Sequence, residues 1–332
     1  MYADVSRAAN DDSCASPILA FVSGSSPLPP ELRDAILTWY AARGRELPFR
    51  DTTDPYAILV SEVMAQQTQA ARAGEAWTRF MNTFPTVGSL ANAPPADVLR
   101  AWQGLGYNRR AINLQRAARV IVDEHGGRVP SDLASLEALP GVGPYTARAV
   151  AALAFGVPVG AVDTNVRRVL GRVVAGDTGA MDAATLQRVA DDAVPPDQPG
   201  LWTHALMDVG ATLCHSRRPE CESCPARPWC RYVAVVAAGS TALAPPAPMR
   251  PAARETAAPF TSTSRWLRGR IVERLRGVPN GEWMDVAGPI GDHDRAAVDE
   301  ALAALARDGL VELDPTAMPN GPDGVRCARL PT

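Results

Sequence analysis

The chain has 332 residues, of which 46% are hydrophobic and 21% charged, the composition of a globular protein long enough for two or three domains. No apolar run approaches the roughly 18 residues that a membrane span needs, and the N-terminal residues carry more acids than bases, unlike a secretory signal. A cytoplasmic protein without a membrane partner is therefore predicted, and its net charge of −3 taken alone argues against a nucleic-acid partner.

The first two predicted regions in chain order are a tail and a helical core. Residues 1–28 are rich in Ser, Ala, Asp and Pro and lack periodicity, so we predict a disordered tail. From residue 29 to residue 232, apolar residues recur at spacings of three and four, as in Leu114, Ala117 and Ile121. This spacing is typical of amphipathic helices, so the core is predicted to be mainly α-helical.

Two windows of this core are basic although the whole chain is acidic. Residues 98–122 contain five arginines and no acid, and residues 164–176 contain three arginines and no acid. Local basic faces matter more than total charge for binding phosphates, so these windows favour a nucleic-acid partner. Solvated helix faces are the alternative. The chain contains no lysine, so all 33 basic residues are arginine.

A glycine-rich turn, LPGVG at 139–143, follows a predicted Ala/Leu-rich helix at 133–138 and precedes another helix. Glycines lack a Cβ atom, so they let the backbone approach a partner closely and adopt positive φ angles. The free N–H groups at the start of the next helix attract an anion. We therefore predict that Gly141, Val142 and Gly143 bind one DNA phosphate, with helix capping as the simpler alternative.

The end of the core holds a cluster of cysteines. Six, two and five residues separate the four members of the cluster, which are Cys214, Cys221, Cys224 and Cys230. Thiolates are soft ligands, and four within so short a segment can hold one metal centre. Zinc modules usually contain two CxxC pairs whereas this segment contains one, so the spacing favours a [4Fe-4S] cluster over zinc. Arg217 and Arg218 lie between the first two ligands and are predicted to contact a DNA phosphate.

Together with the hairpin and the cysteines, four further segments resemble the endonuclease III superfamily and, within it, the adenine-specific MutY-type glycosylases. These segments are LPFR at 47–50, SEVMAQQTQ at 61–69, GLGY at 104–107 and AVDTNVRR at 161–168. The resemblance covers about residues 30–232. It implies a helix-hairpin-helix DNA glycosylase fold, with a six-helix barrel at about 47–157 and a cluster domain formed by about 29–46 and 158–232.

The resemblance assigns catalysis to Glu62, Asp163 and Tyr145. Cleaving an N-glycosidic bond requires activation of the leaving base and stabilisation of a cationic sugar, which two carboxyl groups with separated pKa values can provide. Glu62 lies in an apolar helical segment, where burial would raise its pKa and keep a proton for N7 of adenine; periodicity alone would make it an ordinary surface glutamate. Asp163 would stabilise the sugar as a carboxylate, cap the helix that follows it, or do both. The Tyr145 hydroxyl is expected to hydrogen-bond Asp163 or the sugar.

Four more residues at motif positions are assigned to DNA contacts: Arg50, Gln67, Tyr107 and Arg109. Gln67 and Tyr107 are expected to fill the space left by a flipped base and to wedge beside the opposite guanine, which partly offsets the cost of unstacking. Tyr145 stands where lyase-competent relatives carry lysine, so the chain is expected to be monofunctional.

The implied function is base-excision repair, in which a nucleoid-associated monomer releases adenine from A:8-oxoguanine or A:G mispairs in double-stranded DNA. Two alternatives stay open: a thymine or uracil mismatch glycosylase of the same superfamily, and a non-catalytic DNA-binding regulator with an iron–sulfur cluster. The run at residues 66–68, Gln-Gln-Thr, favours adenine, and the presence of both Glu62 and Asp163 argues against the regulator.

The C-terminal part of the chain is predicted to be separate from the core. Residues 233–263 are dominated by Ala, Pro, Ser and Thr and are predicted to be a linker. Residues 264–332 are predicted to form a small winged-helix-like α+β module, because two amphipathic helices precede two short strands near 310–313 and 324–330. A plain α+β packing module is the alternative. This part does not resemble the Nudix-like module of MutY-type glycosylases.

Overall fold

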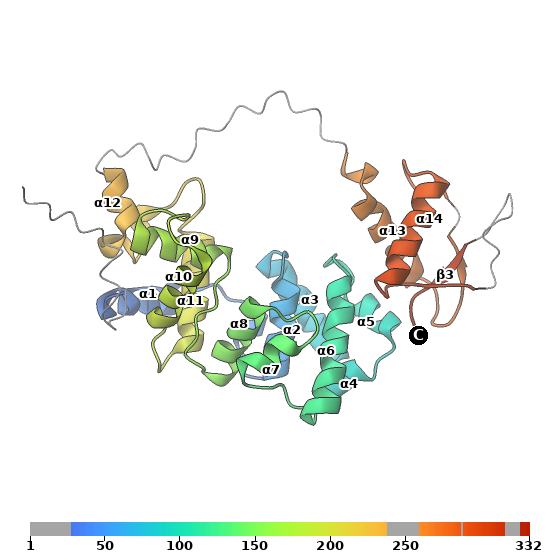
Figure 1. Cartoon of the computed structure of the whole chain (residues 1–332), viewed down its shortest axis with the longest axis horizontal. Coiled ribbons are helices and arrows are strands. Elements are labelled where there is room, and N and C mark those ends of the chain that lie inside the picture. The colour runs from blue at the N-terminus through green and yellow to red at the C-terminus, as the bar shows by residue number, and fades with distance from the viewer. Residues whose placement is uncertain (1–27, 238–258, 287, 316–325) are drawn as a thin grey trace, which may run out of the picture.

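The computed structural model describes residues 28–237, 259–286, 288–315 and 326–332 of the chain (Figure 1). Over these ranges the protein is mainly helical with one small sheet near the C-terminal end, which confirms the predicted fold class. The predicted tail lies outside the described residues except for Leu28, which is buried. Within the described ranges, no helix combines the length and the apolar character that crossing a membrane requires.

The described residues form the following helices and strands. The α-helices are α1 (Pro30–Arg43), α2 (Pro55–Ala65), α3 (Ala70–Thr83), α4 (Val87–Ala91), α5 (Pro95–Ala101), α6 (Arg109–His125), α7 (Leu133–Ala138), α8 (Pro144–Phe155), α9 (Thr164–Leu170), α10 (Ala183–Ala193), α11 (Pro199–Thr212), α12 (Arg231–Ala237), α13 (Ser264–Arg276) and α14 (Arg295–Arg307). Shorter helical turns are η2 (Pro48–Arg50), η3 (Gly171–Ala175, π-helical), η4 (Cys221–Ser223), η5 (Arg227–Trp229) and η7 (Phe260–Ser262). The strands are β1 (Met284–Asp285), β2 (Glu312–Leu313) and β3 (Cys327–Arg329).

Several helix starts are determined locally by capping residues. Aspartates accept a hydrogen bond from a backbone N–H of the first turn in five helices: Asp54, Asp132, Asp163, Asp182 and Asp294. This satisfies a donor that has no partner inside the helix. Proline occupies an early position of α2 and α8, where its missing N–H costs nothing. The helix predicted after Asp163 ends at Leu170 and continues as the π-helical turn η3.

Two hydrophobic cores organise these helices. The first core is formed by residues of α2 to α8 and includes the fully buried Trp102 and Phe80. The second core joins α1 to α9, α10 and α11, and contains Leu32 and Trp202. In Figure 1, α1 therefore lies beside α11 although the two helices are distant in the sequence. Helix α11 also packs against α8, so it connects the two cores.

The C-terminal residues form the two helices and the strands predicted for them. Strand β3 pairs antiparallel with both β1 and β2, giving the sheet order β1-β3-β2. The pairing of β2 with β3 is the predicted one, and the two-residue strand β1 was not predicted from the sequence. The apolar positions that share helix faces are all buried, namely Leu267, Ile271 and Leu275 of α13 and Val298, Leu302 and Leu305 of α14.

This module packs directly on the helical core. The Arg100 side chain donates to the Arg276 carbonyl at 3.0 Å, and Arg276 in turn donates to the Leu99 carbonyl at 3.0 Å. Buried residues of the module belong to the same hydrophobic core as α2 to α8. The linker also begins later than predicted, since α12 extends to Ala237; most of the predicted linker lies outside the described residues.

Candidate functional site

Helix α2 carries Glu62 into the protein interior. Its cap Asp54 starts the helix, and every residue from Tyr56 to Met64 is buried, so the helix has no solvent-facing side over this stretch. Glu62 is 7% exposed, which rules out the surface position that periodicity alone suggested. Desolvation raises the Glu62 pKa to about 7, and the charge of Asp163 contributes in the same direction. The carboxyl group is therefore half protonated near neutral pH.

Tyr145, in the first turn of α8, contacts Glu62 rather than Asp163. Its hydroxyl donates a hydrogen bond to Glu62 Oε2 at 3.1 Å, in place of Asp163, the first of its two expected partners; the second, the sugar of bound DNA, stays a prediction. The reason is tertiary packing, because α8 lies against α2 and directs its first turn at Glu62. Burial, together with the charges of Glu62 and Asp163, raises the Tyr145 pKa well above its ordinary value. The phenol therefore stays protonated and remains a hydrogen-bond donor.

Asp163 lies at the start of α9, close enough to influence the pKa of both Glu62 and Tyr145. Its Oδ1 accepts the backbone N–H of Val166 at 2.7 Å, and its Oδ2 accepts the side-chain amide of Asn165 at 2.9 Å. The helix-capping role is thus present, and it fixes the orientation of the carboxylate. The structure brings together the three residues to which catalysis was assigned.

Glu62 and Ser61 line a surface-open cavity of about 410 Å³ between η2, α2, the end of α8 and the start of α11. His204 of α11 lines the same cavity, and its buried Nδ1 has no hydrogen-bond partner among the described residues. Desolvation lowers the His204 pKa to about 3, so the imidazole is neutral at physiological pH. Sequence reasoning missed this residue because a single histidine in an apolar helix resembles an ordinary core residue.

Arg50 occupies a different place from the DNA-contacting surface predicted for it. Its two terminal nitrogens donate to both carboxylate oxygens of Asp208, at 2.8 and 2.7 Å, and Asp208 has no exposed side-chain surface. Arg45 donates to the same carboxylate at 2.8 Å. This buried ion pair joins η2 to α11, and the guanidinium of Arg50 lines the wall of the Glu62 cavity. Arg50 was predicted to contact DNA because the sequence does not indicate its pairing with Asp208, which lies 158 residues away.

Gln67 and Tyr107 both adopt left-handed backbone conformations, with φ of +54° and +45°. Such angles cost about 1–3 kcal/mol for residues other than glycine and persist only when the surroundings impose them. Here Arg110 imposes them: it donates to the carbonyls of Val63 and Met64 on one side and of Leu105 and Gly106 on the other. One guanidinium therefore fixes both turns, and both predicted DNA-inserting side chains are exposed.

Arg110 itself appeared in the sequence only as one member of a basic window. Its hydrogen bonds span more than 40 residues of sequence, so no local pattern indicates them. Desolvation lowers the Arg110 pKa to about 10, and the side chain stays charged at neutral pH. The neighbouring Arg109 is largely exposed and lies 3.7 Å from Asp308 of the C-terminal module.

The predicted hairpin connects α7 to α8. Gly141 has φ of +82°, and a Cβ atom there would lie 2.8 Å from the Cβ atom of Asn113, so glycine is required on two grounds. Gly143 has an extended backbone and open space beside it, and caps the start of α8. Val142 is buried and anchors the turn. The exposed backbone of the two glycines is thus available to a phosphate, although only Gly141 uses a positive φ.

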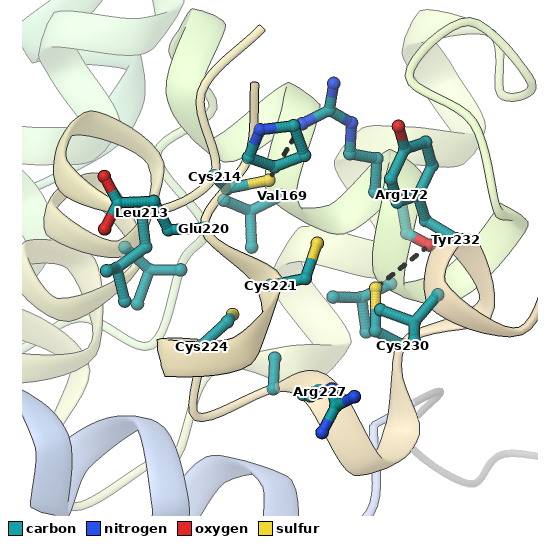
Figure 2. A pocket seen from close by; sticks show the side chains of 15 residues that line it. Val169, Arg172, Leu213, Cys214, Glu220, Cys221, Cys224, Arg227, Cys230 and Tyr232 are labelled. Carbon is teal, nitrogen blue, oxygen red and sulfur yellow. Dashed lines mark hydrogen bonds between the residues drawn. The ribbon is translucent and has the colours of Figure 1, made fainter. Parts of the chain in front are cut away.

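The four clustered cysteines line one common pocket (Figure 2). A single zinc ion with Zn–S bonds of about 2.3 Å would hold its sulfurs about 3.8 Å apart. In the described part of the chain, no group of three or more His, Cys, Asp or Glu side chains is placed to hold a metal ion. Four thiols that line one pocket are nevertheless the donor set that an iron–sulfur cluster uses.

The surroundings of the cysteines supply positive charge. The largely buried Arg172 donates to Cys214 Sγ at 3.3 Å and stacks over Tyr232. Burial raises the pKa of Cys224 to about 11, so the free thiol is favoured when no metal is bound. Arg217 and Arg218 are both exposed in the loop between Cys214 and Cys221, as a phosphate-contacting loop requires.

Comparison with known proteins relates this arrangement to a family. Residues 60–191 match the model of the HhH-GPD superfamily of base excision DNA repair proteins. The chain is 41% identical over 288 residues to the adenine DNA glycosylase of Mycobacterium tuberculosis, covering 83% of this chain and 88% of that relative. A thermostable thymine-DNA glycosylase superposes with a TM-score of 0.58 at 32% identity, over 61% of this chain and 94% of that one. The structure of a trapped covalent intermediate of endonuclease III with DNA superposes with a TM-score of 0.54 at 26% identity, over 62% of this chain and 95% of that one. The chain therefore belongs to the adenine DNA glycosylase (MutY-type) family of DNA N-glycosylases, within the HhH-GPD superfamily.

Proposed function

We propose that this protein releases adenine from A:8-oxoguanine and A:G mispairs in double-stranded DNA. The observation that carries the proposal is a buried carboxyl group, Glu62, whose pKa is raised to about 7 beside the hydroxyl of Tyr145 and the carboxylate of Asp163. A proton donor next to an ionised carboxylate is the pair of groups that glycosidic bond cleavage needs. The named activity of the Mycobacterium tuberculosis relative supports adenine as the base.

In the proposed mechanism, protonated Glu62 gives its proton to N7 of the flipped adenine. The C1′–N9 bond then breaks, its electron pair leaves with adenine, and the sugar becomes an oxocarbenium ion that the Asp163 carboxylate stabilises. A water molecule adds to C1′ and passes a proton to the Glu62 carboxylate, which restores the acid. Gln67 and Tyr107 occupy the space left in the duplex, and the backbone of Gly141 and Gly143 holds one phosphate in the turn that Val142 anchors.

A strand-specific excision assay tests this function. Duplexes containing one A:8-oxoguanine, A:G, T:G or U:G pair are incubated with the protein and treated with alkali, which breaks the strand at each abasic site. Cleavage of the adenine strand in the first two duplexes is expected. Cleavage confined to T:G or U:G would make the protein a thymine or uracil mismatch glycosylase, and binding without any cleavage would make it a regulator.

The pH dependence of base release is expected to report the protonation of Glu62. Only the protonated carboxyl group can give a proton, so the single-turnover rate should fall about tenfold per pH unit above pH 7. The hydrogen bond from Tyr145 lowers the Glu62 pKa, so Tyr145→Phe should move this alkaline limb to higher pH, whatever its effect on the maximal rate. A limb that stays in place or moves to lower pH in the variant would contradict the assignment.

We further propose that Cys214, Cys221, Cys224 and Cys230 hold a [4Fe-4S] cluster, as is common in the endonuclease III superfamily. The bound cluster would supply structural cross-links through its iron–thiolate bonds. The positive charge of Arg172 beside Cys214 would offset part of the negative charge of the four thiolates. The ligand set would hold the Arg217–Arg218 loop in place for a DNA phosphate.

Protein purified without oxygen is expected to contain about four iron atoms per chain, the count for a cubane held by four thiolates, and to show a broad visible absorption. Cys221→Ser should weaken DNA binding more than it slows the chemical step, because the cluster positions the arginine loop. Cys327→Ser is the matched control, since Cys327 lies in β3 away from the cluster. Stoichiometric zinc in place of iron would refute the proposal.

A further inference from the structure

A second groove lies between the core and the C-terminal module. One wall is the turn that contains Tyr107 with the first residues of α6, and the other is η7 with the N-terminal half of α13; the end of α14 and Leu310 complete it. The groove has a volume of about 650 Å³ and shares no lining residue with the Glu62 cavity. It is therefore a separate surface feature that the proposed chemistry does not use.

The groove concentrates positive charge in a protein whose net charge is −3. Among the described residues that line the groove, Asp308 is the only acid. It forms an ion pair with Arg268 and lies 3.7 Å from Arg109. Five arginines line the groove: Arg109, Arg110, Arg265, Arg268 and Arg270. A cleft with one sign of charge raises the local concentration of an oppositely charged ligand, and phosphates are such a ligand.

The groove is continuous with the turn that carries the predicted wedge. The Tyr107 ring is 41% exposed, and the Arg265 guanidinium of α13 stacks over it, 4.1 Å from the ring centroid. Phe260 lines the same groove and is 61% exposed. The side of Gly269 that would carry a Cβ atom faces open space, so the α13 backbone is also accessible there. Arginine, aromatic and open backbone groups together suit a nucleic-acid strand.

The C-terminal end of α13 holds the module against the core. Glu273 accepts a hydrogen bond from Gln103 at 2.7 Å, and Arg276 donates to the Asn108 side chain at 2.9 Å. These contacts leave Arg265 and Arg270, both exposed, directed at the groove. The wall that α13 forms therefore has an orientation determined by the fold.

We propose that this groove binds the sugar-phosphate backbone of the DNA strand that carries the base opposite the excised adenine. The inference rests on the proposed function. The adenine strand must deliver its base to the Glu62 cavity, so the strand on the other side of the Tyr107 wedge is the one that meets α13. The C-terminal module would thus add phosphate contacts that the helical core lacks.

The salt dependence of DNA binding tests the proposal. Each phosphate contact contributes about 0.9 to the slope of log K against log salt. The double variant Arg265→Ala/Arg270→Ala should lower the slope by about 1.8, so a fourfold rise in salt should weaken wild-type binding about tenfold more than variant binding. Arg265→Lys/Arg270→Lys keeps both charges and should retain the wild-type slope. Arg274→Ala removes an exposed arginine of the same helix outside the groove and should change nothing.

Hydroxyl-radical footprinting assigns the strand. The duplex carries 2′-fluoro-2′-deoxyadenosine opposite 8-oxoguanine, because the fluorine disfavours glycosidic cleavage. The Arg265→Ala/Arg270→Ala variant should lose protection on the 8-oxoguanine strand beside the mispair and keep it on the adenine strand.

An unchanged salt slope together with an unchanged footprint would overturn the proposal. Loss of protection confined to the adenine strand would also overturn it. Excision by the wild type is measured separately, so a protein that shows the predicted slope and footprint without releasing adenine would refute the proposed function alone.

Discussion

Replacing Glu62 with glutamine is expected to lower the rate of adenine release by about 10²–10⁴-fold, the usual cost of losing one acid–base group. Glutamine keeps the shape of the side chain and can still accept the Tyr145 hydrogen bond, which in the wild type is 3.1 Å long. It cannot give a proton to adenine or take one from water. The measurement is a single-turnover excision rate on an A:8-oxoguanine duplex, with the dissociation constant determined in parallel.

The dissociation constant should change little, because Glu62 is buried and would meet DNA only through the flipped base, where glutamine keeps the shape of the side chain. Glu75→Gln on α3 is the matched control, since it makes the same chemical change at an exposed position and should leave the rate unaltered. A wild-type rate in Glu62→Gln would refute the assignment of Glu62. Equal losses of rate and affinity would instead indicate that Glu62 holds the fold of the site together.

Treatment of the reacting complex with borohydride is expected to trap no covalent protein–DNA adduct. Bifunctional glycosylases attack the sugar with a lysine amine, form a Schiff base and then nick the strand. This chain contains no lysine, and arginine cannot substitute because its guanidinium stays protonated. The resemblance to the endonuclease III superfamily places Tyr145 at the position of that lysine, and its raised pKa keeps the phenol protonated. The product should therefore be an intact strand with an abasic site.

The positive control for trapping is endonuclease III, for which a trapped covalent complex with DNA is known. Gel electrophoresis without alkali should show an uncut product strand for this protein, and alkali should cut it. The α-amino group of the chain is the one amine that could still react. A trapped adduct that maps to this chain by mass spectrometry and survives removal of residues 1–27 would contradict the mechanism proposed above.

The sequence alone predicted the features that depend on neighbouring residues. Spacings of three and four predicted the helices, and the buried faces of α13 and α14 confirm this for the C-terminal module. The turn glycine Gly141 was predictable because its left-handed backbone is a local requirement. The four cysteines were predictable as neighbours in space because they are close in sequence, and they line one pocket. The motif around Glu62 predicted the family, which the comparisons confirm.

Tertiary structure decided which side chains meet. Tyr145 pairs with Glu62 across 83 residues of sequence, and Arg50 pairs with Asp208 across 158, so neither partner could be chosen from local pattern. Arg110 clamps the turns of Gln67 and Tyr107 only because α2 and α6 pack together. The physical reason is that hydrogen bonds and desolvation depend on the distance between groups in space. Periodicity determines which face of a helix is buried, and only the packing of the helices determines what that face contacts.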